Sequence, residues 1–143
     1  MKRSAALLVG TFVTATTLSG CGGGNAYCDA VDKGKTTLNT FGQKRTDAAY
    51  ANYAKVFDEV GKVAPASVRK DWTKLADVTK GVISAQKSVG LALEDMTDTT
   101  KVKKLTSAQL KKLNTAYQAF NATQTQRNAV VKNVKQECKI TLK

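Results

Sequence analysis

The segment PASVRKDWTKLADVTKGVISAQKSVG, residues 65–90, carries the clearest secondary-structure signal in this chain. Its apolar side chains recur at steps of three, four or seven residues, which places them on one face of an α-helix. They are Val68, Trp72, Leu75, Val78, Val82 and Val89. Pro65 suits the opening of a helix because the first turn does not use the N–H that proline lacks. The segment therefore predicts a long amphipathic helix that ends near Gly90.

Two similar stripes precede this helix. Residues 26–41 carry Tyr27, Val31, Leu38 and Phe41 at helical spacing, although Gly34 interrupts the stripe. Residues 42–45 are expected to form a turn, and Thr46 is a suitable N-cap for the next helix. That helix has a stripe of Tyr50, Tyr53, Phe57, Val60 and either Val63 or Ala64, and Pro65 ends it.

A fourth helix is expected after a loop over residues 91–105. Thr106, followed three residues later by Gln109, has the pattern of a capping box and opens a helix over residues 107–138. The stripe of this helix comprises Leu110, Leu113, Tyr117, Phe120, Val131, Val134 and Cys138. No segment alternates as a strand would. The sequence therefore predicts an all-α fold, an up-down-up-down four-helix bundle.

Composition excludes several classes of function. The chain has 143 residues and no histidine, so it has room for one domain and lacks the commonest general base and metal ligand. It contains no nucleophile elbow, phosphate loop or dinucleotide fingerprint. The acidic residues Glu94, Asp95 and Asp98 lack the alternating spacing of a calcium loop. We predict a protein that is not an enzyme and that holds no metal.

The N-terminal segment has the layout of a secretory signal. A cationic start, Met1-Lys2-Arg3, precedes a mostly apolar or small run from Ala5 to Leu18, which is short for a membrane span. The run ends in Leu18-Ser19-Gly20-Cys21, which resembles the lipobox of bacterial lipoproteins. The alternative is an ordinary signal peptide with a chance cysteine.

The lipobox resemblance implies cleavage before Cys21 and a diacylglyceryl group on its thiol. Two acyl chains give the stable attachment that one chain does not. The predicted organisation is a signal peptide over residues 1–20, a lipidated cysteine and glycine-rich linker over residues 21–25, and a helical domain over residues 26–143. The chain thus resembles small lipoproteins of actinobacterial type with helical bodies of unassigned role. The resemblance implies a location on the extracytoplasmic face of the cell membrane.

The two other cysteines are expected to form a disulfide. With Cys21 lipidated, Cys28 and Cys138 remain as an even pair in an oxidising compartment. An up-down-up-down bundle brings the start of the first helix and the end of the fourth to the same end, which also favours the pairing. The alternative is two free thiols. A zinc site is disfavoured because two cysteines without histidine do not complete its ligand shell.

Positive charge is concentrated near the C-terminus, where residues 101–143 carry ten basic side chains and one acidic. One group is expected far from the anchor, where it would face an anionic envelope polymer or an envelope protein: Lys101, Lys103, Lys104, Lys111 and Lys112. A second group is expected near the membrane, where it would bind anionic headgroups: Lys132, Lys135, Lys139 and Lys143. The alternative is a merely solvated basic face. Nucleic acid is disfavoured because arginines are few and no aromatic residues alternate with the lysines.

The apolar stripe of the fourth helix is interrupted by polar residues. Gln124, Arg127 and Asn128 occupy the stripe between Phe120 and Val131. A satisfied polar layer or an exposed overhang would explain them. The functional alternative is a small polar pocket in which Arg127 holds an anion or a lipid, so that the protein acts as a small-ligand carrier rather than a polymer-binding module.

Overall fold

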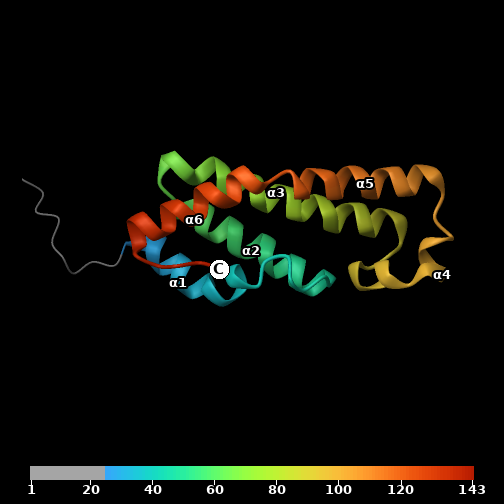
Figure 1. Cartoon of the computed structure of the whole chain (residues 1–143), viewed down its shortest axis with the longest axis horizontal. Helices are drawn as coiled ribbons and strands as arrows, with labels where there is room; N and C mark the ends of the chain where they lie inside the picture. Colours follow the sequence, from blue (N-terminus) through green and yellow to red (C-terminus); the bar gives the residue numbers. More distant parts are fainter. Residues whose placement is uncertain (1–24) are drawn as a thin grey trace, which may run out of the picture.

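The computed structural model describes residues 25–143, and within that range the chain is all-helical (Figure 1). The α-helices are α1 (Ala26–Asn39), α2 (Asp47–Val63), α3 (Ala66–Val89), α4 (Thr99–Val102), α5 (Ser107–Asn121) and α6 (Gln124–Cys138). A short 3₁₀-helix, η1 (Leu93–Thr97), precedes α4. The predicted signal peptide, Cys21 and most of the predicted linker lie outside the described residues.

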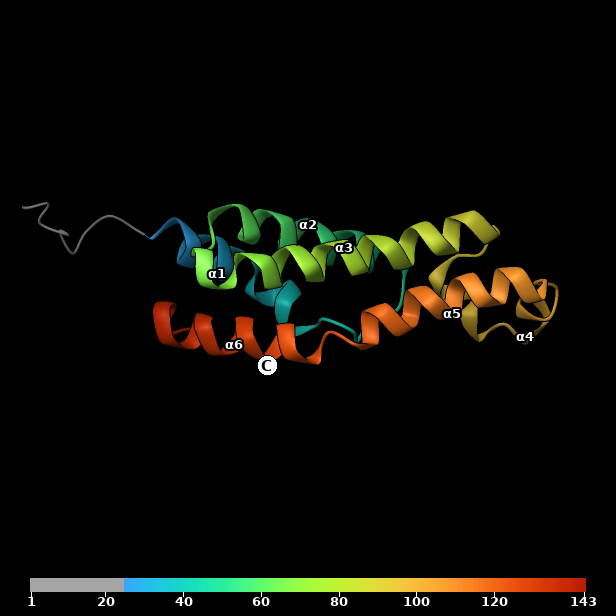
Figure 2. The same cartoon turned by 90° about the horizontal axis from the view of Figure 1, so that it is seen from above.

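Helices α2 and α3 form the centre of an elongated molecule (Figures 1 and 2). At one end α1 packs on α2, and α6 packs on α3 and α1; at the other end α5 packs on α3. Trp72 of α3 is fully buried and donates a hydrogen bond from Nε1 to the Tyr27 hydroxyl of α1 at 3.2 Å. Tyr27 in turn donates to Asn133 Oδ1 of α6 at 2.9 Å. These two linked hydrogen bonds, one buried and one partly buried, fix three helices relative to one another.

Gly34, which interrupts the apolar stripe of the first predicted helix, lies within the continuous helix α1. The glycine is buried where α1 crosses α2, and a Cβ built on it would lie 2.6 Å from Val56 Cγ1. Two helices approach most closely where one of them has no side chain. The glycine therefore brings α1 and α2 together and stays within the regular helix.

The predicted helix boundaries at Thr46, Gly90 and Thr106 are confirmed. The Thr46 side chain accepts from the Ala49 N–H, and Thr106 with Gln109 forms a reciprocal capping box. Gly90 ends α3 with a φ of 70°, and the Leu91 N–H donates to the Gln86 carbonyl at 3.2 Å. This left-handed C-cap favours glycine because a Cβ is strained there.

The prediction of one continuous fourth helix is wrong, since α5 ends at Asn121 and α6 begins at Gln124. The break shifts the buried face by one position, so that Val130 is buried and Val131 is 36% exposed. Leu110 is also largely exposed, and Ala64 rather than Val63 is the buried residue at the end of the second stripe. The described chain therefore has five long helices, not four.

The expected loop over residues 91–105 is partly helical. Asp98 caps α4 by accepting hydrogen bonds from the N–H groups of Thr100 and Lys101. Lys101 Nζ lies 2.6 Å from Asp95 Oδ1, and this hydrogen bond lowers the pKa of Asp95. Asp47 Oδ1 also accepts from the Leu93 N–H at 3.0 Å, which ties the segment to the start of α2.

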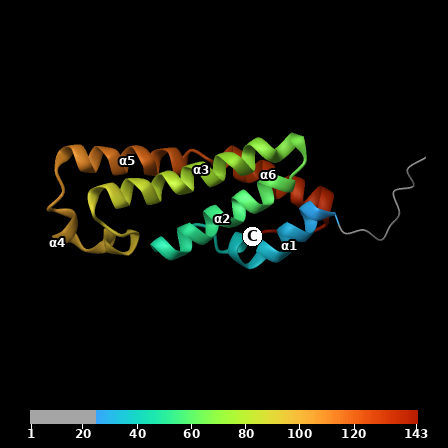
Figure 3. The ribbon, with the colours of Figure 1, turned by 180° about the vertical axis from the view of Figure 1, so that it is seen from behind.

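The predicted disulfide is confirmed. Cys28 and Cys138 are bonded, and their Cα atoms lie 5.2 Å apart. The bridge joins the first turn of α1 to the last residue of α6, at the end of the molecule where the described chain begins (Figures 1 and 3). From Cys138 the last five residues run back along α1, and the Lys143 N–H donates to Asn39 Oδ1 at 2.8 Å.

Candidate functional site

The break between α5 and α6 is organised by the Phe120 carbonyl. In a continuous helix this oxygen would accept from the N–H four residues later. Here it accepts instead from the Thr123 hydroxyl at 2.7 Å, from Arg127 Nη2 at 3.2 Å and, less closely, from the Thr123 backbone N–H at 3.4 Å. The buried Thr123 side chain thus competes with the helical hydrogen bond, as threonine hydroxyls can. A cation at the C-terminal end of α5 also suits the helix dipole.

Arg127 is held in a defined position by aromatic rings. Its Cζ atom lies 4.8 Å from the centre of the Phe41 ring and 5.0 Å from that of Phe120. Nε donates to Thr123 Oγ1 at 3.0 Å. Burial lowers the pKa of Arg127, and among the described residues no carboxylate lies within 4 Å of its guanidinium. The side chain is therefore a half-buried cation without an ion-pair partner.

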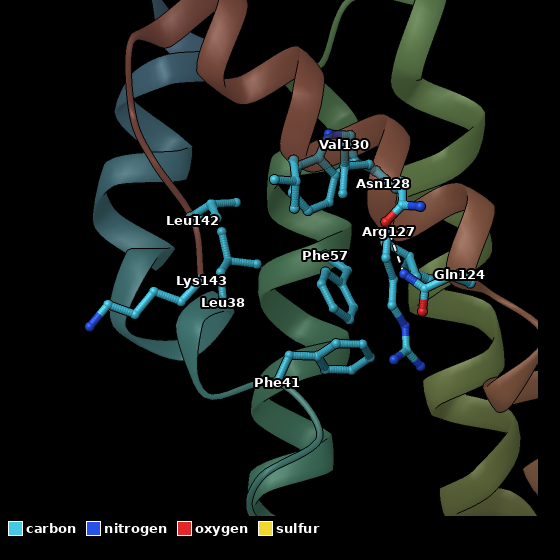
Figure 4. A pocket seen from close by; sticks show the side chains of 12 residues that line it. Leu38, Phe41, Phe57, Gln124, Arg127, Asn128, Val130, Leu142 and Lys143 are labelled. Atoms are coloured by element: carbon cyan, nitrogen blue, oxygen red, sulfur yellow. Dashed lines mark hydrogen bonds between the residues drawn. The ribbon is translucent and has the colours of Figure 1, made fainter.

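Gln124, Arg127 and Asn128 all line a cavity of about 370 Å³ (Figure 4). The remaining wall is mostly apolar and comes from the other helices and the C-terminal segment: Leu38, Phe41, Phe57, Trp72, Leu75, Val130, Val131, Leu142 and Lys143. Gln124 Nε2 donates to Asn128 Oδ1 at 2.9 Å, so these exposed amides pair with each other. Figure 4 shows the Arg127 side chain running past them so that its guanidinium lies beside the Phe41 ring.

A second cavity, of about 260 Å³, has Arg127 in its wall as well. It lies between the segment that leads into α2 and the end of α5, and its lining is Gly42, Arg45, Tyr50, Tyr117, Phe120, Asn121 and Arg127. Gln86, which is fully buried, donates from Nε2 to the Tyr117 hydroxyl at 2.7 Å and so fixes that ring; Gln86 Oε1 has no partner. The two arginines of this wall are 82 positions apart in the sequence.

Tyr50 is the least exposed polar side chain of this second cavity, at 2%. Its ring stacks on Phe120, with centroids 5.4 Å apart. Within residues 25–143 the hydroxyls of Tyr27, Tyr53 and Tyr117 form hydrogen bonds, whereas the Tyr50 hydroxyl forms none. Burial and the nearby Tyr117 raise the pKa of Tyr50, while Arg45 and Arg127 oppose that shift. Both guanidiniums are thus close enough to act electrostatically on the Tyr50 hydroxyl.

The sequence indicated only the Arg127 part of this arrangement. Arg45 lies in a turn, and Tyr50 and Tyr117 lie at core positions of amphipathic stripes, so nothing local marks them as neighbours. Their proximity depends on where α5 ends and on how α3 spaces α2 from α5. The one available signal was the group of polar residues, Arg127 among them, that interrupts the apolar stripe of the fourth predicted helix.

No protein-family model matches the chain. No curated protein and no solved structure matches it either. The function must therefore be argued from the chain's own residues.

The first group of lysines lies at the end of the molecule opposite the disulfide. Lys101 is in α4, Lys103 and Lys104 follow it, and Lys111 and Lys112 are in the first half of α5 (Figure 1). All five side chains are exposed. Lys101 pairs with Asp95, whereas the other four have no carboxylate within 4 Å among the described residues. We call Lys103, Lys104, Lys111 and Lys112 the distal lysines.

The second group of lysines is divided by the structure. Lys132, Lys135 and Lys139 lie on or just after α6, in the half of the molecule that holds the disulfide. Lys143 does not join them, because the C-terminal segment carries it back to Asn39, at the far end of α1. The continuation of the chain after Cys138 was not evident from helical spacing.

Within residues 25–143, no group of three or more cysteine, aspartate or glutamate side chains is placed to hold a metal ion. The same part of the chain contains no helix with the length and apolar character needed to cross a bilayer.

Proposed function

We propose that this protein is a lipid-anchored, non-enzymatic binding protein of the bacterial cell envelope. In this proposal the lipidated Cys21 and the glycines after it tether the helical domain to the outer face of the membrane. The distal lysines then bind an anionic envelope polymer. The lipobox supports the anchor, and the disulfide supports an oxidising compartment.

The position of the distal lysines is the observation that carries this proposal. The described chain begins beside the disulfide, so a tether would attach at that end. The distal lysines lie toward the opposite end, near the C-terminal end of α3, whose 24 residues extend about 36 Å. Charges are screened over about 8 Å at physiological salt, so in a domain that stands upright on the membrane these lysines would act on something other than the anchoring bilayer.

The disulfide end would have a different role. Lys132, Lys135 and Lys139 would lie near anionic headgroups and add to the lipid attachment, at up to about 1 kcal/mol for each lysine close to the surface. We further propose that α5 and α6 together correspond to one interrupted helix of the bundle. With α1, α2 and α3 they then form four units in up-down-up-down order, and the anchored end lies opposite the binding end.

Polymer binding is tested with long-chain polyphosphate as the probe. The variant replaces Lys103, Lys104, Lys111 and Lys112 by glutamine, and we expect its affinity for polyphosphate to fall by about tenfold or more at physiological salt. The matched control replaces Lys33, Lys62, Lys70 and Lys74, four exposed lysines of α1, α2 and α3. Affinity should change little in this control. Equal losses in both variants would mean that only net charge matters, and the proposal would be wrong.

The anchor is tested separately, by growing cells with a radiolabelled fatty acid. The wild-type protein should carry the label and partition with membranes, whereas Cys21→Ala should carry none. Label on the Cys21→Ala protein would overturn the anchor assignment and leave the polymer result unaffected.

A further inference from the structure

We propose that the 260 Å³ cavity between the start of α2 and the break after α5 is a binding site for a small oxyanion, a phosphate or carboxylate group. The groups that would hold it are the guanidiniums of Arg45 and Arg127 and the hydroxyl of Tyr50. This site lies in the body of the helical domain and is separate from the distal lysines.

Two cations line the cavity, and neither of them forms an ion pair within the described residues. Neither Arg45 nor Arg127 has a carboxylate within 4 Å among the described residues. Asp47 and Glu94 are acidic side chains near this end of α2: Asp47 Oδ1 accepts from the Leu93 N–H, and Glu94 Oε2 accepts from the Asp47 N–H, each at 3.0 Å. Glu94 also lines a neighbouring cavity with Arg45 and Tyr117, but forms no ion pair with Arg45. The cavity wall itself contains no acidic residue.

Arg127 keeps donors available for a ligand. A guanidinium has five N–H groups, and the structure uses one on Thr123 and one on Phe120. The two flanking rings and these two hydrogen bonds hold the planar group in one orientation, so little side-chain entropy would be lost when an anion binds. Arginine also matches the paired oxygens of carboxylate and phosphate, which favours this ligand class over a halide.

The Tyr50 hydroxyl is the independent sign of a ligand. Buried polar groups in native proteins are nearly always hydrogen-bonded. Tyr50 is only 2% exposed and its hydroxyl has no hydrogen-bond partner within residues 25–143, but the oxygen is not fully enclosed and so remains accessible from the cavity that Tyr50 lines. An oxyanion between the two guanidiniums would accept this O–H and satisfy the group. Phenylalanine would fill the core equally well and leave no polar group to satisfy.

The size of the cavity limits the ligand. Sites for drug-sized molecules have volumes of about 300–1,000 Å³, and this cavity lies just below that range. It suits a single phosphate or carboxylate group, with the rest of a larger ligand outside.

The site is tested by calorimetric titration of the domain with inorganic phosphate and, in a second series, with acetate, at constant ionic strength in chloride. We expect saturable binding of at least one anion, and the tighter one identifies the head group. Arg45→Gln should weaken that binding by about tenfold, because it removes one of the two cations that would hold the anion. The Arg45 side chain is exposed and makes no hydrogen bond, so the substitution should not disturb the fold. Tyr50→Phe should weaken it by about fivefold.

Two matched variants show whether these losses are specific. Lys44→Gln removes a positive charge from the residue next to Arg45, and Lys44 does not line the cavity. Tyr53→Phe removes a tyrosine hydroxyl outside the cavity wall, one that donates to the Thr40 carbonyl. Both should bind as the wild type does. The proposal is overturned if neither anion binds saturably, or if Lys44→Gln loses as much affinity as Arg45→Gln. The variant without the distal lysines should bind the small anion as the wild type does. A negative result for polyphosphate binding would therefore not contradict the oxyanion site, and a negative result for the oxyanion site would not contradict polymer binding.

Discussion

At the scale of single residues, Gly34 tests how closely α1 and α2 are packed. An alanine Cβ there would lie 2.6 Å from Val56 Cγ1, and a branched side chain held in a core has little freedom to move away. Overpacking costs about 1–3 kcal/mol, while alanine gains about 1 kcal/mol of helix propensity over glycine. We expect Gly34→Ala to lower the free energy of unfolding by about 1 kcal/mol, measured by urea denaturation.

Gly81 in α3 provides the matched control. A Cβ built at this exposed position meets nothing within 4 Å, so Gly81→Ala should raise the free energy of unfolding by up to about 1 kcal/mol. Opposite signs for the two substitutions indicate a close helix contact at Gly34. If Gly34→Ala stabilises the protein as Gly81→Ala does, the contact is looser than described.

At the scale of helices, Thr123 tests what holds the break between α5 and α6. Thr123→Val keeps the shape of the side chain but removes the hydroxyl that donates to Phe120 and accepts from Arg127. The residue is 1% exposed, so water cannot replace these hydrogen bonds. We expect the free energy of unfolding to fall by about 1–3 kcal/mol, measured by urea denaturation.

Thr115→Val in α5 is the comparison for this substitution. Thr115 makes a similar hydrogen bond, to the Lys111 carbonyl, but is exposed, and its loss should change stability by less than about 0.5 kcal/mol. Equal effects of the two substitutions would show that the Thr123 hydroxyl has no special part in ending α5.

Helix ends of different kinds were not equally predictable. Thr46, Gly90 and Thr106 carry local signals, a capping oxygen or a glycine free to adopt positive φ, and the structure confirms each of them. The end of α5 has no proline or glycine. It depends on a threonine and on an arginine that reaches back from the next helix, and both are compatible with an unbroken helix. The apolar periodicity therefore predicted one continuous helix across the break, and it placed Val131 in the core instead of Val130.

At the scale of the whole molecule, the all-helical class and the Cys28–Cys138 pairing followed from helical spacing and from cysteine number. The proposed oxyanion site did not follow from these signals, because it needs Arg45, which precedes α2, Tyr50 of α2 and Arg127 of α6 to meet at one cavity. Such a meeting depends on the lengths of the helices and on the angles at which they pack. Arg127 was identified because a charged residue on an apolar stripe is unusual, whereas Tyr50 has the same pattern as any core aromatic residue.

The disulfide links α1 to α6, the first and last helices of the described chain, and so contributes to the stability of the whole domain. It joins residues separated by 110 positions, and a loop of about that length is expected to contribute up to about 4.7 kcal/mol by restricting the unfolded chain. The double variant Cys28→Ala/Cys138→Ala should therefore unfold at a clearly lower urea concentration than the oxidised wild type. Reduced wild type should match the double variant, and adding reductant to the double variant should change nothing. The bridge joins α1 to α6, so without it we also expect faster amide hydrogen exchange in both helices than in α3, which lies at the centre of the packing. An unchanged urea midpoint in the double variant would show that helix packing alone is enough to hold α1 and α6 together.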